Sequence, residues 1–206
     1  MISANRITKS FGDRVLWSDL SFTVEAGEMV ALVGPSGSGK STVLNCLGTL
    51  EPVDSGAIVV AGREITRVRA GARRRLRRDT LGYLFQNYAL IENATVDFNL
   101  DVAVTTRDRR SSAEALQRVG LGGRGRDRVY RLSGGEQQRV ALARLIVKKP
   151  KVVLADEPTG ALDSDNATMV IDVLRQMARQ GCAVVIATHS KHVEGGCDAT
   201  VDLGGR

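Results

Sequence analysis

The stretch that most constrains the fold is residues 29–42, where a short apolar run leads directly into a glycine-rich loop. Met29 to Val33 are all apolar, as expected for a strand buried on both faces of a parallel sheet. Three glycines then precede Lys40 and Ser41, and residues 40–49 are expected to form a helix. A buried strand, a glycine-rich loop and a helix in this order predict an α/β fold built on a parallel sheet.

The residue types in this loop are those that bind the phosphates of a nucleoside triphosphate. Its glycines let the backbone curl so that several N–H groups converge on an anion. Lys40 adds a positive charge at the β- and γ-phosphates, and the Ser41 hydroxyl can ligate Mg²⁺. The preceding strand argues against a plain glycine-rich turn. The glycines do not follow the G-x-G-x-x-G spacing of dinucleotide-binding folds, which disfavours binding of NAD. The loop residues expected to contact the nucleotide are Gly34, Pro35, Ser36, Gly37, Ser38, Gly39, Lys40, Ser41 and Thr42.

Strands and helices alternate along most of the chain, which we interpret as one domain over residues 1–206. Strands are expected over 5–11, 20–24, 29–33, 57–61, 81–85, 151–156, 183–188 and 200–203, and helices over 40–49, 66–79, 95–104, 134–147 and 164–179. Residues 87–132 differ in character and are expected to be a helical insertion. Within them, Ser111-x-x-Glu114 has the spacing of a capping box and predicts the start of a short helix that ends at Gly120.

Composition places the chain among cytosolic globular proteins. Hydrophobic residues make up 43% of the chain, and no apolar run approaches the roughly 18 residues of a membrane span. The first residues lack the apolar core of a signal peptide. The three cysteines are scattered, without metal-ligand spacing, and are expected to be reduced thiols.

The net charge of +6 is concentrated in one arginine-rich stretch. Its members are Arg67, Arg69, Arg73, Arg74, Arg75, Arg77 and Arg78. The stretch is interpreted as a solvated helix face or as a surface near phospholipid headgroups. Nucleic acid is the least favoured partner, because aromatic residues make up only 4% of the chain and few are available for base stacking.

A second apolar strand, residues 152–155, ends in Asp156 and Glu157. Ligands of open α/β sheets bind at the carboxyl ends of the strands. Asp156 is therefore placed to hold Mg²⁺, directly or through water, and Glu157 to polarise a water toward the γ-phosphate. A solvent-exposed strand end is the alternative, which the phosphate-binding loop upstream makes less favourable.

The third informative stretch is Leu132-Ser133-Gly134-Gly135-Glu136. Ser133 and Glu136 have the spacing of a capping box, so an ordinary helix start is one interpretation. Two glycines inside a first helical turn are unfavourable by about 1 kcal/mol each. That loss is explained if exposed N–H groups must closely approach an anion.

Together these motifs resemble the nucleotide-binding subunit of ATP-binding-cassette (ABC) transporters. Residues 34–42 match Walker A, 152–157 match Walker B and 132–136 match the family's signature motif. The resemblance covers nearly the whole chain. It implies a P-loop core with a parallel sheet, an antiparallel β subdomain on the N-terminal side and a small helical insertion.

The resemblance also implies roles for single residues. Gln86 resembles the Q-loop glutamine, which touches Mg²⁺ and senses the membrane partner. Asp163 lies in a D-loop, and His189 resembles the switch histidine at the γ-phosphate. Phe11 stands where the family has an aromatic residue stacked on adenine, with Val15 beside it. The signature residues Ser133, Gly134, Gly135 and Glu136 are expected to contact ATP bound to a second copy.

The closest likeness is to the lipoprotein-release, macrolide-export and cell-division branch, and within it to small bacteriocin- or peptide-export ATPases. The implied function is Mg²⁺-dependent ATP hydrolysis that drives a separately encoded integral membrane permease. Lys40, Gln86, Glu157 and His189 are the expected catalytic residues, and Ser41, Gln86 and Asp156 the metal site. In the ATP-bound state the chain is expected to form a head-to-tail homodimer. It is expected to lie at the inner face of the cell membrane through its permease, and nucleic acid is not an expected partner.

The sequence departs from the family's pattern in two respects, and two other functions are alternatives to a transporter ATPase. The segment between Gln86 and Ser133 is short. The chain also ends soon after its last strand, so no regulatory domain is expected. A soluble ATPase of DNA repair or chromosome handling would share the motifs but carry long coiled coils, and no heptad insertion is present. A nucleotide-dependent assembly switch, as in cell division, would turn over slowly, although Glu157 and His189 are intact.

Overall fold

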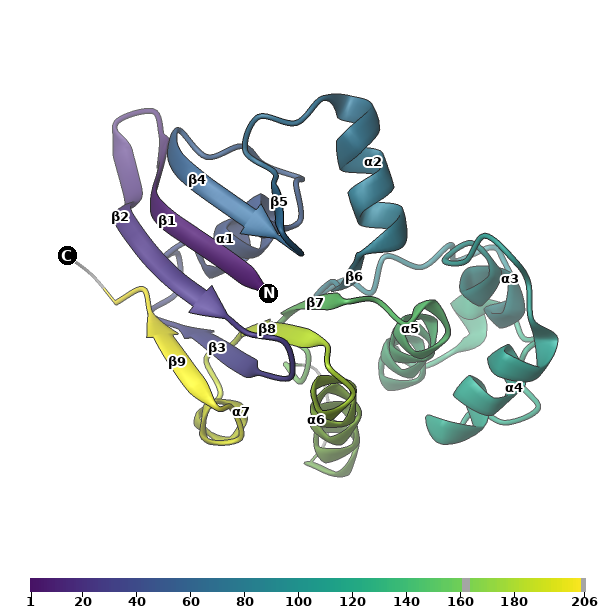
Figure 1. Cartoon of the computed structure of the whole chain (residues 1–206). Helices are drawn as coiled ribbons and strands as arrows, with labels where there is room; N and C mark the ends of the chain where they lie inside the picture. The colour runs from purple at the N-terminus through teal and green to yellow at the C-terminus, as the bar shows by residue number, and fades with distance from the viewer. Residues whose placement is uncertain (161–163, 205–206) are drawn as a thin grey trace.

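Two β-sheets and the helices around them make up the computed structural model, which describes residues 1–160 and 164–204 (Figure 1). The antiparallel sheet has the order β2-β1-β4-β5, and the parallel sheet has the order β6-β7-β8-β3-β9. The strands are β1 (Ile2–Phe11), β2 (Arg14–Val24), β3 (Met29–Val33), β4 (Ser55–Val60), β5 (Arg63–Glu64), β6 (Leu81–Leu84), β7 (Val152–Asp156), β8 (Ala183–Ala187) and β9 (Ala199–Asp202). This arrangement confirms the predicted α/β fold with its antiparallel sheet on the N-terminal side.

The helices divide between the parallel sheet and a separate group to one side of it (Figure 1). They are α1 (Lys40–Leu47), α2 (Ala70–Asp79), α3 (Val96–Asp101), α4 (Arg109–Arg118), α5 (Gly134–Lys148), α6 (Ser164–Arg179) and α7 (Lys191–Gly195), with a 3-10 turn at Val129–Arg131. Helices α3 and α4 lie beside α5, beyond the edge strand β6. The short elements β5 and α7 were not predicted, since neither has enough residues to show a periodic pattern.

The parallel sheet is buried on both faces, which explains its continuous apolar strands. Along β7, Val153 points into a cluster that contains residues of α5 and α6. Its neighbour Leu154 points into a second cluster, with residues of α1 and the antiparallel sheet. Successive side chains of a strand alternate between faces, so both must be apolar. Each such buried Val or Leu contributes about 1.5–3 kcal/mol to stability.

The strands of the antiparallel sheet are longer than the sequence predicts. Strand β1 begins at Ile2 and β2 extends back to Arg14, so that Phe11 pairs with Arg14 across the predicted turn. The alternation of apolar and polar residues is broken by register shifts along this pair. Arg6 and Asp19 lie in these irregular regions with positive φ. Backbone pairing therefore continues through positions where the sequence pattern does not indicate a strand.

The predicted start of the fourth helix is wrong. Helix α4 begins at Arg109 rather than after Ser111, and Asp108 is its N-cap. The Asp108 Oδ1 accepts hydrogen bonds from the N–H groups of Arg110, at 3.0 Å, and Ser111, at 3.3 Å. A carboxylate in this position satisfies two of the helix's free N–H groups. The other half of the expected box, Glu114, instead pairs with Arg110 one turn earlier, at 2.9 Å.

Two other helices are shorter than expected. The helix predicted over 95–104 is α3, capped by the Thr95 side chain and only six residues long. The arginine-rich helix begins at Ala70 rather than near residue 66, because Arg69 has an extended backbone.

The three cysteines are free thiols, and burial raises the pKa of Cys46 to about 12. Among the described residues, no helix has both the length and the apolar character needed to cross a membrane.

Candidate functional site

The glycine-rich loop connects β3 to α1, and close packing determines its shape. Gly39 adopts a left-handed conformation (φ 89°) and is the N-cap of α1. A Cβ at this position would lie 2.9 Å from the indole Nε1 of Trp17, so a larger residue would be both strained and crowded. In the part of the chain that the structure describes, no side chain caps this end of α1. The first N–H groups of α1 are therefore left for an anion.

Lys40 folds back over this loop. Its Nζ donates hydrogen bonds to the carbonyl oxygens of Gly34, at 2.8 Å, and Pro35, at 3.1 Å. The ammonium group is thus held beside the free end of α1. The charge of the lysine and the helix dipole add, and both favour a bound phosphate.

Two neighbouring carboxylates end the central strand β7 and face different partners. Asp156 Oδ1 accepts a hydrogen bond from the Ser41 hydroxyl at 2.9 Å. Burial raises the pKa of Asp156 above its ordinary value, and the Ser41 hydroxyl opposes that shift. Glu157 has left-handed backbone geometry (φ 46°), and its N–H donates to the Ala187 carbonyl at 2.9 Å. This sharp change of direction points the adjacent carboxylates to separate positions.

The carboxylate of Glu157 reaches His189, which follows β8. The Glu157 Oε1 and His189 Nδ1 atoms lie 2.8 Å apart. Both line a cavity of about 550 Å³ at the carboxyl end of the parallel sheet. Its lining residues are Phe11, Leu16, Ser36, Gly37, Gly39, Lys40, Ser41, Thr42, Gln86, Glu157 and His189. The predicted lysine, glutamine, glutamate and histidine are thus gathered in one place from four separate segments.

The oxygen atoms near Ser41 fit a magnesium ion. Ser41 Oγ and Asp156 Oδ1 are hard donors, and the Gln86 side chain lines the same cavity. No cluster of three His, Cys, Asp or Glu side chains that could hold a metal occurs among the described residues. A site with few protein ligands is typical of Mg²⁺, which keeps water and substrate phosphates in its coordination shell.

The signature residues lie outside the lining of this cavity, at the start of α5. Ser133 is the N-cap: its Oγ accepts from the Glu136 N–H at 3.3 Å, and Glu136 Oε2 accepts from the Ser133 N–H at 2.8 Å. Both halves of the predicted capping box are therefore present. Arg124 donates to the other oxygen of Glu136 and to Asp127, which ties the preceding loop to the signature. The residues of the predicted D-loop, Asp163 among them, lie outside the described residues.

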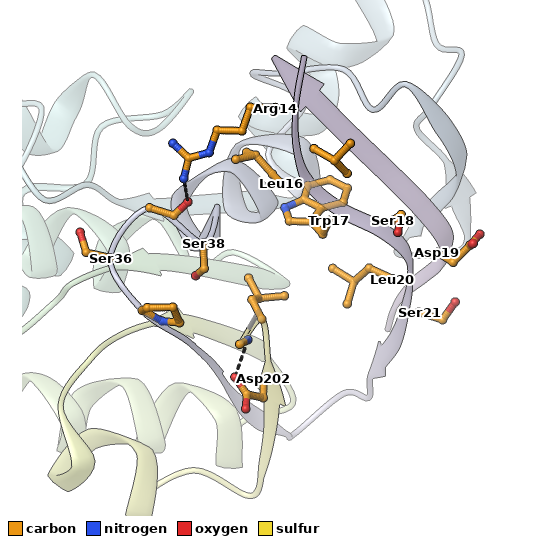
Figure 2. A pocket seen from close by; sticks show the side chains of 15 residues that line it. Arg14, Leu16, Trp17, Ser18, Asp19, Leu20, Ser21, Ser36, Ser38 and Asp202 are labelled. Carbon is orange, nitrogen blue, oxygen red and sulfur yellow. Dashed lines mark hydrogen bonds between the residues drawn. The ribbon is translucent and has the colours of Figure 1, made fainter. Parts of the chain in front are cut away.

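A second cavity shares Leu16, Ser36 and Gly37 with the first and is lined by β2, the loop and the end of β9 (Figure 2). Pro35, Ser38 and Val15 line this second cavity. Arg14 donates from its Nη2 to the Gly37 carbonyl oxygen at 2.9 Å, which joins the β1–β2 hairpin to the loop. The predicted contact of Val15 with a nucleotide base stays a prediction, and the residue that lies with Phe11 in the first cavity is Leu16.

Besides the predicted Phe11 and Val15, three residues of the β1–β2 hairpin that the sequence did not indicate contribute to the site. Leu16 and Arg14 contact the loop, and Lys9 places its Nζ 4.8 Å from the centre of the Phe11 ring. The available signal was that Lys9 and Phe11 are two residues apart, and so lie on one face of a strand. Taken together, the site can bind a polyphosphate at the loop and hold a proton acceptor, Glu157, on the far side of it.

Comparison with known proteins agrees with this geometry. Residues 17–160 match the profile of a family described as ABC transporter. The chain is 40% identical over 203 residues to a macrolide export ATP-binding/permease protein, MacB, of Burkholderia pseudomallei (94% of this chain, 31% of the relative). It is 43% identical over 190 residues to MacB of Shigella flexneri (89% and 29%). The chain thus spans about a third of the length of these relatives.

Solved structures show the same architecture. One is the ATP-binding cassette MJ0796, a dimer in a post-hydrolysis state bound to ADP and Pi. It superposes with a TM-score of 0.89 at 29% identity, over 98% of this chain and 94% of the other.

Proposed function

Because the chain belongs to the ABC transporter family, we propose that its hydrolysis of ATP drives a separately encoded membrane permease. The chain is an ATPase domain of this family. The MacB relatives, whose names join an ATP-binding part and a permease, support a permease partner. Residues 87–132 are the helical subdomain that would contact it, with Gln86 at the start of that segment.

The observation that carries this proposal is the meeting of Lys40, Glu157 and His189 around one cavity next to the free end of α1. In the proposed site the triphosphate lies along the loop, and its charge is neutralised by Lys40 and the helix N-terminus. Glu157 orients or deprotonates the attacking water on the side of the γ-phosphate. His189 holds the Glu157 carboxylate and supports the charge that develops on the γ-phosphate.

Ser41, Asp156 and Gln86 are the residues that would hold Mg²⁺. When bound, the ion would supply positive charge beside the β- and γ-phosphates. The hydrogen bond between Ser41 and Asp156 keeps their oxygens together at this position.

We further propose a head-to-tail homodimer with ATP between the two copies. The signature at Ser133 lies outside the lining of the cavity in its own chain, yet presents the N-terminus of a fifteen-residue helix, α5. A second copy can bring that helix end to the γ-phosphate. The dimeric MJ0796 structures support this arrangement.

The binding site is tested by Lys40→Ala. Loss of the ammonium group should weaken ATP binding by about a hundredfold, since a hydrogen bond to a charged group contributes roughly 1.5–3 kcal/mol. Isothermal titration calorimetry measures the affinity. Lys151→Ala removes an exposed lysine immediately before β7 and is the matched control. Unchanged affinity in the Lys40 variant would show that the loop is not the nucleotide site.

Coupling to a permease gives a separate expectation. The purified chain should hydrolyse ATP slowly, and the rate should rise when it is reconstituted with the membrane protein encoded beside it. The reason is that Gln86 lies both in the cavity and at the start of the segment proposed to contact the permease. Phosphate release in proteoliposomes measures the rate. A rate that no co-encoded membrane protein changes contradicts the transporter role and favours an assembly switch.

The arginine-rich segment supports a position at the inner face of the membrane. Residues 63–79 hold eight arginines and two carboxylates, Glu64 and Asp79, so this segment has the same net charge of +6 as the whole chain. Leu76 is the buried residue of α2, while exposed arginines cover its other side. The guanidinium groups of Arg63, Arg67, Arg69, Arg74 and Arg75 make no hydrogen bond or ion pair with any described residue. Strand β6 then leads from α2 directly to Gln86, beside the proposed permease contact.

Binding to vesicles tests this position. The chain should sediment with vesicles of equal parts phosphatidylglycerol and phosphatidylcholine. Replacing Arg67, Arg69, Arg74 and Arg75 by Gln should weaken binding by more than about a hundredfold, at roughly 1 kcal/mol per arginine. The matched control replaces four exposed basic residues elsewhere, Arg109, Arg126, Lys151 and Arg179. An equal loss in the control, or tighter binding of duplex DNA than of vesicles, contradicts a membrane-facing segment.

A further inference from the structure

Lys9 is a buried cation placed against the aromatic ring that lines the nucleotide cavity. Its side chain is on β1, two residues before Phe11, and therefore on the same face of the strand. The Nζ atom lies 4.8 Å from the centre of the Phe11 ring, which is within cation–π range. Lys9 is only 5% exposed, whereas Phe11 is 52% exposed. The lysine thus covers the ring from within the protein, and much of the ring stays open to the cavity.

The ammonium group of Lys9 is held firmly by the segment that follows α1. It donates to Glu51 Oε1 at 2.7 Å and to the Pro52 carbonyl oxygen at 2.9 Å, and Asp54 Oδ1 lies 3.5 Å away. The hydrogen bond to Glu51 raises the pKa of Lys9 above its ordinary value, so the group is charged at neutral pH. These contacts fix the ammonium group relative to α1, the helix whose first turn lines the same cavity.

We propose that Lys9 is a positioning residue for the nucleotide base: it holds the Phe11 ring in the orientation that stacks on adenine. The proposal rests on the proposed function, in which ATP occupies the cavity. Phe11 is the last residue of β1, next to the turn at residues 12–13, and its side chain is half exposed, so the contact with Lys9 restrains a ring that is otherwise largely open. A cation on the inner face of the ring restrains it and draws electron density from it. The outer face is then better suited to an electron-rich purine.

This role differs from simple stabilisation of the strand. A residue that only stabilises the fold would affect all ligands of the site equally. A residue that acts through the Phe11 ring should affect the base and leave the phosphates unaffected. Inorganic tripolyphosphate carries the phosphates without a base, so it separates these two cases.

The test compares four proteins: wild type, Lys9→Met, Phe11→Leu and the double variant. Methionine has nearly the length of lysine and no hydrogen-bonding group, and Glu51, whose side chain is 34% exposed, can turn to water. Each protein is titrated with ATP and with tripolyphosphate, both with Mg²⁺, and its melting temperature is recorded. Arg63→Gln, which removes an exposed charge from the same sheet, is the control for net charge.

We expect Phe11→Leu to weaken ATP binding about tenfold, the range of one base–aromatic stack. Lys9→Met should weaken it about fivefold, as for the loss of one cation–π contact with a half-exposed ring. Tripolyphosphate should bind equally to all four proteins. The double variant should bind ATP no more weakly than Phe11→Leu, since Lys9 acts through the ring.

Several results would overturn the inference. They are additive losses in the double variant, an equal loss of tripolyphosphate binding in Lys9→Met, or failure of both Lys9→Met and Lys9→Gln to fold, which would make Lys9 a stability residue. Unchanged ATP affinity in Phe11→Leu would overturn it too, without affecting the proposed function. The proposed site itself fails only if Lys40→Ala binds ATP as tightly as wild type does.

Discussion

Glu157→Gln should retain ATP binding but lose between a hundredfold and ten-thousandfold of ATP turnover, the usual contribution of a general base. The amide keeps the size of the side chain and can still hydrogen bond to His189, whose Nδ1 lies 2.8 Å from Glu157 Oε1. It cannot accept a proton from water. Because the loop and Lys40 are unaffected, ATP should remain bound between two copies, which stay together because the ATP is not hydrolysed. Size-exclusion chromatography with light scattering should then show a stable dimer after addition of ATP.

The matched control is Glu92→Gln, which removes an exposed carboxylate from the helical segment. It should turn over ATP and elute as wild type does. His189→Ala is a second comparison, because it removes the partner of Glu157 and leaves the carboxylate itself. We expect an intermediate rate for this variant. Wild-type turnover in Glu157→Gln would show that another group handles the water.

The buried parts of this fold could be predicted from sequence because burial leaves a clear pattern. Strands β3, β7 and β8 are continuous apolar runs, since each of them faces helices or the second sheet on both sides. The antiparallel sheet was only partly recognised, because its pairing continues through polar residues and register shifts. Helix α4 was misplaced because Asp108, three residues earlier than the expected cap Ser111, accepts the free N–H groups.

The same distinction applies to the site. Lys40, Ser41, Asp156 and Glu157 were predicted because each occurs in a short local motif next to a strand. The contacts of Lys9 with Glu51, and of Arg14 with Gly37, join residues more than twenty positions apart. No local pattern indicates such pairs, so only the folded structure could reveal them. The position of Ser133 outside the cavity lining likewise became visible only once α5 was placed.

The proposed sharing of one site between two copies leads to a prediction about mixed proteins. Ser133→Arg places a bulky cation where the γ-phosphate and the end of α5 must meet, so ATP should bind at Lys40 while the dimer cannot close. Lys40→Ala should bind ATP about a hundredfold more weakly than wild type, while its signature stays intact. Each variant alone should have no measurable ATPase activity.

The Ser133→Arg variant needs a control, because Ser133 Oγ also caps α5 through the Glu136 N–H. Loss of an N-cap costs about 1 kcal/mol of stability. Ser133→Asn keeps a capping oxygen without the cation and should retain more activity than Ser133→Arg. Equal melting temperatures of the two variants would show that charge and bulk, rather than helix stability, account for the difference.

In a mixed dimer, Lys40 of the Ser133→Arg copy faces the intact Ser133 of the Lys40→Ala copy. One complete site is rebuilt, and the opposite site carries both defects. Mixing the two inactive proteins should therefore restore ATPase activity, up to about a quarter of the wild-type rate if copies pair at random and the single site works at half the rate of two. Phosphate release measured across mixing ratios should be greatest at equal amounts. Activity of Ser133→Arg on its own would refute the shared site, because a monomer would then complete the reaction without a signature from a second copy.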